Sequence, residues 1–246
     1  MSASTLRIGV LMPEVLGTYG DTGNALILAE RARRRGIEAE VVHVGLTEDI
    51  PDSLDIYTLG GGEDTAQALA ADKFRGTSGL SRALDAGRPL LAICASLQVL
   101  GHWYEDARGV RVPGMGVLDI TTRPQGHRAI GELVCEPVLD GLPQTLPGFE
   151  NHGGGTVLGP DASPLGRVIS GVGNGTPQGE EAPEVRYDGA VQGSVIATYM
   201  HGPALARNPE LADLLLKRAT GATLEPLDVP GVAELRKERL AGIQLS

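Results

Sequence analysis

Apolar runs of strand length alternate with helical patterns in the first half of the chain. The runs predict strands over residues 6–12, 38–44, 55–59 and 89–93. Periodicity and end signals predict helices over residues 25–35, 64–71, 80–86 and 95–103. Strands that alternate with helices form βαβ units, whose strands lie parallel in one sheet. We therefore expect an α/β fold with a central, mostly parallel sheet flanked by helices.

Helical periodicity fades after Gly109, and short strand-like runs separated by Gly, Pro and Asn turns take its place. These runs cover residues 117–121, 131–135, 156–158, 167–169 and 194–199. They predict antiparallel strands that extend the sheet or form a small second one. Residues 171–183 (GVGNGTPQGEEAP) predict a mobile loop, and helices are expected over 209–219 and, at the surface, over 234–241. We expect one domain over residues 1–220 and a C-terminal tail over 221–246.

Composition narrows the function classes. The 246 residues are 41% hydrophobic and 21% charged, which is a globular balance. A net charge of −10 repels phosphate backbones and argues against a nucleic-acid partner. No apolar run approaches the roughly 20 residues that span a bilayer, and the first residues lack a secretory pattern. With only Cys94 and Cys135 as thiols, a reducing, cytoplasmic compartment is expected.

The sharpest local feature is Cys94, which stands where the strand over 89–93 passes directly into a helix. This is the layout of a nucleophile elbow, in which the neighbours two positions away must be small. Those neighbours are Ala92 and Ser96. A thiol at a helix N-terminus is also favoured as a thiolate. The alternative is a small apolar cysteine packed in the core, which is our interpretation of Cys135.

A thiol nucleophile needs a base, and His201 is the best-placed histidine. It follows the apolar run over 194–199, so it is expected at the carboxyl edge of the sheet, where α/β sites form. His152 lies in a glycine-rich loop and is a second candidate, whereas His43 and His102 have the positions of structural residues. The alternative for His201 is a capped loop histidine.

Acyl transfer also needs donors for an oxyanion. Three glycines, residues 60–62, close the strand over 55–59, and glycine lets backbone N–H groups turn toward a ligand. The backbone N–H of Ala95, directly after Cys94, is a second expected donor. A triple glycine also serves as a plain turn or a phosphate loop. The P-loop pattern is absent, because no Gly-Lys-Ser/Thr follows.

Taken in order, these features resemble the class I glutamine amidotransferases, and more narrowly their cobyric-acid-synthase-like branch. The other motifs that carry the resemblance are residues 19–24 (YGDTGN), 59–64 (LGGGED), 126–128 (GHR), 151–154 (NHGG), 199–203 (YMHGP) and 207–211 (RNPEL). The resemblance spans roughly residues 7–216. It implies a flavodoxin-like fold that hydrolyses glutamine to glutamate and ammonia.

The resemblance also implies roles for individual residues. Cys94 would attack the side-chain amide, and His201 would act as the general acid and base. The N–H groups of Gly61 and Ala95 would hold the oxyanion. Arg128 would bind the substrate, since a guanidinium can hold the carboxylate of free glutamine; by its surroundings alone it would be a surface charge. Two further residues, Gln98 and His152, are candidate substrate contacts.

The chain departs from the family pattern in two places. The elbow has Ala92 and Ser96 where glycine is usual, and both are small enough. Most class I enzymes carry a Glu two residues after the catalytic His, but this position is Pro203 here, a gap that the cobyric-acid-synthase-like branch shares. Either His201 works in a dyad or an acid comes from elsewhere. We hypothesise that a partner protein supplies the acid, which would make glutamine hydrolysis partner-dependent.

The resemblance finally implies a partner. Ammonia must be delivered to a synthetase, and this chain has neither a P-loop nor the length for an ATP-dependent ligase. Within the branch, the motifs are most like glutaminase subunits that form a cytoplasmic heterodimer with a Mur-ligase-like subunit. That partner uses ATP and Mg²⁺ to amidate the α-carboxyl of D-glutamate in lipid II, in peptidoglycan synthesis. We expect no cofactor or metal in this chain, and a partner docked near the loops of Cys94 and His201.

Three rival functions stay open from the sequence. The first is an amidotransferase for a corrinoid acid, although such enzymes usually carry their own ATP-binding domain. The second is a free-standing cysteine hydrolase or peptidase on the same fold. The third is a non-catalytic binding or redox-sensing protein that retains the elbow.

Overall fold

The central sheet has the parallel order that the alternating pattern predicts. The computed structural model describes residues 5–241 and places six strands in this sheet in the order β11-β12-β4-β3-β1-β2. Its strands are β1 (Leu6–Leu11), β2 (Ala39–Val44), β3 (Ile56–Leu59), β4 (Leu90–Ile93), β11 (Ala190–Gln192) and β12 (Val195–Thr198). All neighbours are parallel except β11, which is antiparallel to β12. Counted along the chain, the parallel strands follow the flavodoxin-like order, so the predicted fold class is confirmed.

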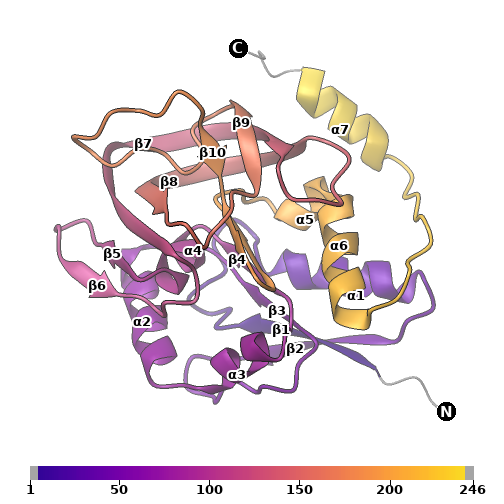
Figure 1. Ribbon diagram of the computed structural model, residues 1–246. Helices are drawn as coiled ribbons and strands as arrows, with labels where there is room; N and C mark the ends of the chain where they lie inside the picture. Colours follow the sequence, from indigo (N-terminus) through magenta and orange to yellow (C-terminus); the bar gives the residue numbers. More distant parts are fainter. Residues whose placement is uncertain (1–4, 242–246) are drawn as a thin grey trace.

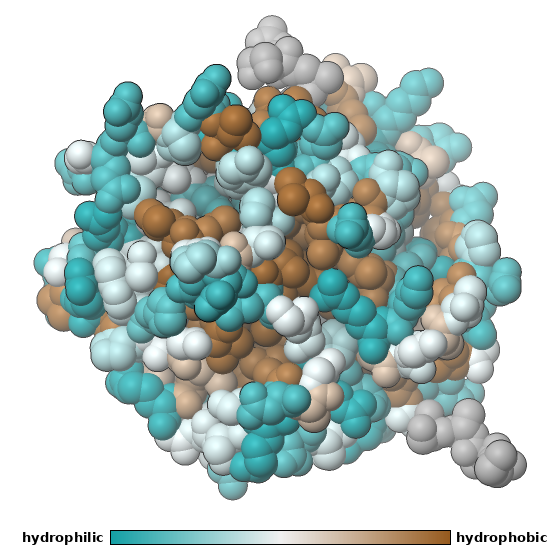
Figure 2. All heavy atoms as spheres, viewed as in Figure 1, coloured by the Kyte–Doolittle hydropathy of each residue, from teal (hydrophilic) through white to brown (hydrophobic). Residues whose placement is uncertain are grey.

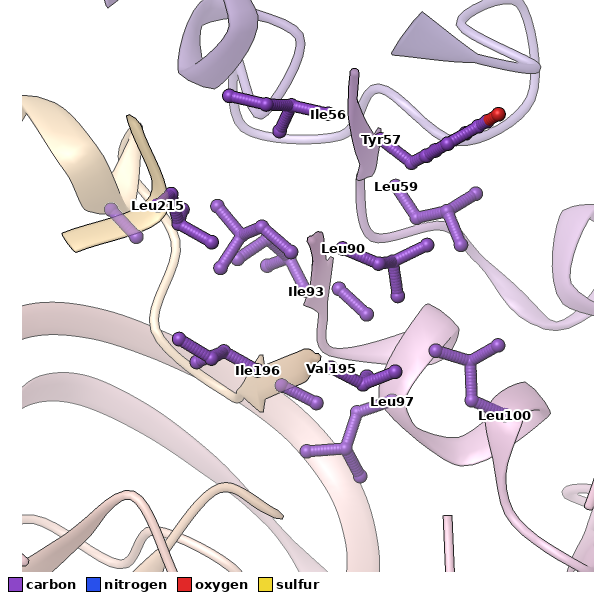
Figure 3. Close-up of a cluster of buried hydrophobic side chains, with 14 of the residues drawn as sticks. Ile56, Tyr57, Leu59, Leu90, Ile93, Leu97, Leu100, Val195, Ile196 and Leu215 are labelled. Carbon is purple, nitrogen blue, oxygen red and sulfur yellow. The ribbon is translucent and has the colours of Figure 1, made fainter. Parts of the chain in front are cut away.

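Helices cover both faces of this sheet (Figure 1). They are α1 (Gly23–Arg33), α2 (Asp64–Arg75), α3 (Gly79–Asp85), α4 (Ala95–Leu100), α5 (Ala204–Arg207), α6 (Pro209–Thr220) and α7 (Val232–Ala241). The first group, α1, α5 and α6, packs together, and α2 packs against α4. Leu215 of α6 and Leu100 of α4 approach the sheet from opposite sides (Figure 3). The helix expected over 95–103 ends earlier, because Gly101 is extended and the chain enters a strand at Trp103.

The core lies in the middle of the central sheet. Every residue of β3, β4 and β12 is buried. Side chains such as Ile56, Leu90 and Ile196 point to the two helical layers (Figure 3). A strand covered on both faces needs apolar residues at successive positions, which is why these segments read as continuous apolar runs. This burial holds the strand ends, and the loops that follow them, in fixed positions.

The second half of the chain forms a second, mostly antiparallel sheet, while its antiparallel strand β11 extends the central one; both arrangements were expected. Its strands are β5 (Trp103–Glu105), β6 (Arg111–Pro113), β7 (Ile120–Pro137), β8 (Leu146–Leu158), β9 (Gly166–Ser170) and β10 (Tyr187–Asp188). Two of them, β7 and β8, form a hairpin much longer than the predicted runs. The pattern missed its length because β7 contains Pro124 and Gly126, which are typical of turns. The register between β7 and β8 shifts at this point, between Pro124 and Ala129.

The segment 171–183 has no helix or strand, and its first residues are anchored. Glu150 of β8 accepts hydrogen bonds from the backbone N–H groups of Val172 and Gly173, at 2.7 and 2.9 Å. The mobility of this segment stays a prediction.

The C-terminal tail carries the surface helix that was expected. No residue of α7 is buried, and Arg236 holds it to Glu210 of α6 at 3.0 Å. Residues 242–246 of the predicted tail and residues 1–4 of the predicted domain lie outside the described part of the chain. Between residues 5 and 241, no helix has the length and apolar character required to cross a bilayer. Hydrophobic atoms show in the middle of one face, and hydrophilic residues surround them (Figure 2).

Asp188 is a fully buried carboxyl at the end of β10. Burial raises the pKa of Asp188 to about 7, although Oδ2 accepts a hydrogen bond from Thr198 and Oδ1 accepts one from the Tyr199 N–H. Because the folded state binds this proton more tightly than the unfolded state, stability should fall as pH rises from about 4 to 7.

We expect Asp188→Asn to remove this fall, which amounts to at most about 4 kcal/mol of unfolding free energy. Urea unfolding of the wild type and the variant at pH 4.5 and 7.5 gives the unfolding free energy of each protein at each pH. The comparison shows how much of the change with pH is lost in the variant. Equal pH dependence in the two proteins would show that Asp188 is ionised throughout.

Candidate active site

Loops that follow neighbouring parallel strands bring the predicted residues to one edge of the central sheet. Strand β4 pairs with β12 on one side and with β3 on the other. The register places Ile93 opposite Thr198, and Ala92 opposite Leu59. Because all three strands run in the same direction, Cys94, His201 and the glycines after Leu59 leave the sheet at the same edge.

Cys94 has the strained backbone of an elbow. Its φ is +52°, which is unusual for a residue with a side chain, and α4 begins at the next residue. The Cys94 N–H donates to the carbonyl oxygen of Thr198 at 2.8 Å, which ties the elbow to β12. Ser96 does more than fit a small space, since its hydroxyl donates to the Gly60 carbonyl oxygen at 2.5 Å. The elbow is therefore locked to the glycine loop.

His201 is buried beside this cysteine. Its backbone bridges to Phe149 of β8, with the His201 N–H 2.8 Å from the Phe149 oxygen. A Cβ built on Gly61 would lie 2.6 Å from His201 Cε1 and 3.3 Å from Cys94 Cβ, so one point in space touches both residues. The structure thus brings the two residues together, as the sequence predicted.

The acid beside His201 comes from the same chain. Asp21 Oδ2 lies 2.8 Å from His201 Nδ1, and both side chains are buried. An acid of this chain therefore occupies the Nδ1 side of the ring, where the hypothesis placed an acid of the partner. The dependence of glutamine hydrolysis on a partner stays a prediction. The sequence pattern missed Asp21 because it lies 180 positions from His201, in a glycine-rich turn where an aspartate is typical of the turn itself. Its only signal was its place in the YGDTGN motif.

Opposing effects act on the pKa of His201. Burial lowers the pKa of the imidazole, but the Asp21 carboxylate and the Cys94 sulfur outweigh burial and raise it to about 10. A negative group on each side of the ring favours the imidazolium form. The surroundings therefore favour the imidazolium form of His201.

A cavity of about 350 Å³ opens in front of the cysteine. The predicted residues that line it are Cys94, Ala95, Gln98, Arg128 and His152, together with Gly62. Gly61 differs from the expectation, because its N–H donates to Asp21 Oδ2 at 2.8 Å and so is not free for an oxyanion. The glycine that reaches the cavity is Gly62.

One wall of the cavity is a hydrogen-bonded network. Gln98 accepts from the Gln67 side chain at 2.6 Å and donates to the Tyr199 hydroxyl at 3.0 Å, so its amide is held at both ends. The ring of His152 stacks on Tyr199 with centroids 3.8 Å apart, and its Nδ1 lies 3.0 Å from the Gly154 oxygen. Both candidate contacts are therefore rigid parts of the wall.

Arg128 lies on β7, and the residue that holds it, Asn151, lies on β8, the other strand of the hairpin. Its Nε donates to Asn151 Oδ1 at 2.5 Å, while Asn151 also contacts the Tyr19 hydroxyl. With Nε held, the two terminal nitrogens of the guanidinium are left to meet a ligand in the cavity.

The residues interpreted as structural do not line this cavity. His102 lies 2.9 Å from Asp119, and His43 is on the exposed side of β2. Cys135 is fully buried in β7, and burial raises the pKa of its thiol well above the usual range. Such a thiol is a poor nucleophile at neutral pH.

The fold and the site together define an α/β protein with a nucleophile elbow, in which a cysteine lines a cavity and a buried histidine–carboxylate pair lies beside that cysteine. The family model of the CobB/CobQ-like glutamine amidotransferase domain matches residues 7–209. The chain belongs to this family.

Individual relatives agree with the family. The subunit GatD of lipid II isoglutaminyl synthase (glutamine-hydrolysing) from Staphylococcus aureus is 36% identical, with 96% of this chain and 94% of the relative covered. The GatD subunit of the same name from Streptococcus pneumoniae is 33% identical, with 96% and 89% covered. A probable cobyric acid synthase from Methanothermobacter thermautotrophicus is 35% identical, with 80% of this chain but 38% of the relative covered.

Solved structures agree on the fold. A glutamine amidotransferase crystal structure aligns with a TM-score of 0.55 at 20% identity, over 87% of this chain and 99% of that one. A glutamine amidotransferase from Thermotoga maritima aligns with a TM-score of 0.50 at 17% identity, over 89% and 91%.

The close approach at Gly61 yields a prediction. In Gly61→Ala the new methyl group would lie 2.6 Å from His201 Cε1, so the imidazole must move. We expect glutamine hydrolysis to fall by about 10²-fold, the cost of a misplacement of about 1 Å. In the control Gly76→Ala the added carbon meets no atom nearer than 3.6 Å, and activity should be retained. An active Gly61→Ala enzyme would contradict this packing.

Proposed function

We propose that this protein hydrolyses L-glutamine to glutamate and ammonia, and passes the ammonia to an ATP-dependent partner subunit. The observation that carries the proposal is a cavity lined by both Cys94 and Arg128, with His201 packed beside Cys94. The chain also matches glutamine-hydrolysing subunits over nearly its whole length. The cavity, of about 350 Å³, is large enough for a free amino acid. Its lining includes both the Cys94 nucleophile and the Arg128 side chain.

Cys94 is the proposed nucleophile. Its thiolate attacks the side-chain amide carbon of glutamine, and the carbonyl oxygen becomes an oxyanion. The Ala95 N–H, at the start of α4, and the glycine loop at Gly62 are the donors nearest to this oxygen. The elbow holds the sulfur at the end of β4, so little motion is needed before attack.

His201 is the proposed acid and base. The imidazolium gives its proton to the leaving nitrogen, and ammonia departs while Cys94 keeps the glutamyl group as a thioester. The neutral imidazole then takes a proton from water, whose oxygen attacks the thioester carbon. Glutamate leaves, and the Cys94 thiolate and His201 imidazolium return to their starting states.

Arg128 is the proposed anchor for the α-carboxylate of glutamine. Asn151 holds its Nε, so the two remaining nitrogens can meet a carboxylate in parallel. Gln98 and His152 are proposed to shape the wall beside the substrate. Because Gln98 is held by Gln67 and Tyr199, its amide offers the substrate one orientation only.

The partner is proposed to be a Mur-ligase-like subunit that amidates the D-glutamate α-carboxyl of lipid II in peptidoglycan synthesis. The chain covers 94% and 89% of the two lipid II relatives but 38% of the cobyric acid synthase, which favours the lipid II assignment over a corrinoid acid. ATP and Mg²⁺ would be used by the partner and not by this chain. A cytoplasmic heterodimer fits a thiol nucleophile that must stay reduced.

The nucleophile can be tested by labelling. We expect 6-diazo-5-oxo-L-norleucine, an electrophilic analogue of glutamine, to modify Cys94 alone and to abolish glutamine hydrolysis. Peptide mapping by mass spectrometry locates the label, and Cys135→Ala is the matched control that should label normally. Labelling at Cys135, or at neither cysteine, would overturn the proposed chemistry.

The partner can be tested by co-expression. We expect this chain to co-purify with a Mur-ligase-like subunit, and the complex to amidate lipid II with glutamine as the nitrogen source. With Cys94→Ala the complex should form and use free ammonia but not glutamine. Co-purification with a corrinoid-binding synthetase instead would favour the rival amidotransferase, and rapid hydrolysis of peptides by the lone chain would favour a free-standing hydrolase.

A further inference from the structure

We propose that Asp21 is the positioning acid of this site, and that it orients His201 for proton transfer in place of the Glu that Pro203 replaces. The inference rests on the proposed glutamine hydrolysis, in which His201 moves the proton. It assigns the third member of the site to the loop between β1 and α1, a part of the chain far from both Cys94 and His201.

The hydrogen bond at Nδ1 decides which ring nitrogen of His201 keeps its proton when the imidazole is neutral. An ionised carboxylate only accepts, so the 2.8 Å contact with Asp21 Oδ2 requires the proton of His201 to be on Nδ1. Nε2 is then the nitrogen that gains the proton in the imidazolium and carries the lone pair in the neutral ring, and it has no hydrogen-bond partner among the described residues. This leaves Nε2 available to exchange a proton with the sulfur, the leaving nitrogen and water.

Burial makes the contact strong. Asp21 is 2% exposed and His201 is 1% exposed, so water screens neither group. In such surroundings a carboxylate stabilises a neighbouring imidazolium far more than it would at the surface. An acid in this position therefore both orients the ring and supports the charge that the ring acquires.

The same oxygen also holds the glycine loop. Asp21 Oδ2 accepts the Gly61 N–H at 2.8 Å, so one atom joins the base to the loop that borders the cavity. A side chain at Gly61 would fill this contact, since its Cβ would lie 3.3 Å from Asp21 Oδ2. The second oxygen, Oδ1, has no hydrogen-bond partner among residues 5–241, so both contacts of this carboxylate are made by Oδ2.

The local chain places Asp21 with little freedom. The Thr18 N–H donates to the Gly61 oxygen at 3.2 Å, which ties the segment to the glycine loop. Tyr19 and Gly20 then have positive φ values of +58° and +79°, and this turn brings Asp21 back toward the sheet. The Tyr19 ring meets the His201 ring edge-on, with centroids 4.9 Å apart.

Pro203 packs the loop that carries Asp21 close to the segment that carries His201. It packs against the start of α1, where a Cβ built on Gly23 would lie 2.6 Å from Pro203 Cγ. Helix α1 and the loop before it are thus pressed against the segment that carries His201. The position that would carry Glu is filled by a ring, and the carboxylate is supplied by the residue two positions before Gly23.

The competing interpretation is a structural role, in which Asp21 only fixes the Gly61 loop. Asp21→Asn distinguishes this structural role from the proposed positioning role. An amide oxygen can still accept both hydrogen bonds, but the negative charge is lost. The matched control is Asp188→Asn, a buried aspartate near the same strand end that does not touch His201.

We expect Asp21→Asn to lower the kcat for glutamine by about 10⁴-fold, the scale found when the acid of a nucleophile–His–Asp triad is neutralised. KM should stay within about 3-fold, because the residue does not touch the substrate. Nitrogen-15 NMR of His201 should show its pKa fall from about 10 toward the ordinary value near 6.5. The Asp188→Asn control should leave both quantities close to those of the wild type.

Several outcomes decide the matter. A normal kcat, or an unchanged His201 pKa, in a folded Asp21→Asn protein would overturn the proposal and leave Asp21 a structural residue. If that variant does not fold, the wild type decides: a strongly deshielded Nδ1 proton that persists above pH 8 supports the proposal, and titration of His201 at its ordinary pKa overturns it. A wild type that is not labelled at Cys94 by 6-diazo-5-oxo-L-norleucine would instead refute the proposed glutamine hydrolysis itself.

Discussion

Parallel pairing of β3, β4 and β12 is the constraint on which the rest of the site depends. Each of these strands is short and wholly buried, so its end cannot shift without exposing apolar side chains or breaking hydrogen bonds along the sheet. The residues that follow the strands are therefore delivered to one edge with fixed spacing. The glycine loop at residue 60, the cysteine at 94 and the histidine at 201 meet there although the chain separates them widely.

Close backbone approach is the second requirement, and it explains the composition of the loops. Gly60 and Gly61 allow three segments to meet where a side chain would strike the Leu16 oxygen at 2.3 Å or His201 at 2.6 Å. Their chief role is to leave space, and in this structure the Gly61 N–H serves the carboxylate of Asp21. The strained elbow at Cys94 is kept by the same packing, since Ser96 is bonded to Gly60.

The second sheet adds what the central sheet lacks, a wall opposite the cysteine. The β7–β8 hairpin carries Arg128, Asn151 and His152 across the cavity. Tyr199, directly after β12, joins that wall to α4 through Gln98. A single network therefore connects both sheets around the cavity, which accounts for the burial of so many polar groups at this edge.

Local pattern alone determined the α/β class, the mostly parallel central sheet, the elbow at Cys94 and the choice of His201 as the base. These depend on runs of neighbouring residues, and neighbouring residues are what periodicity reports. The pattern misjudged the β7–β8 hairpin, because Pro124 and Gly126 mark turns in most sequences but occur here at an irregularity within a strand.

Only the tertiary structure decided that Asp21 stands behind His201 and that the Gly61 N–H is already engaged. Both facts depend on contacts between segments up to 180 positions apart, whose distance is set by how the sheet and helices pack. No local signal encodes such a distance, since an aspartate in a glycine-rich turn has the same sequence whether or not an imidazole lies beside it.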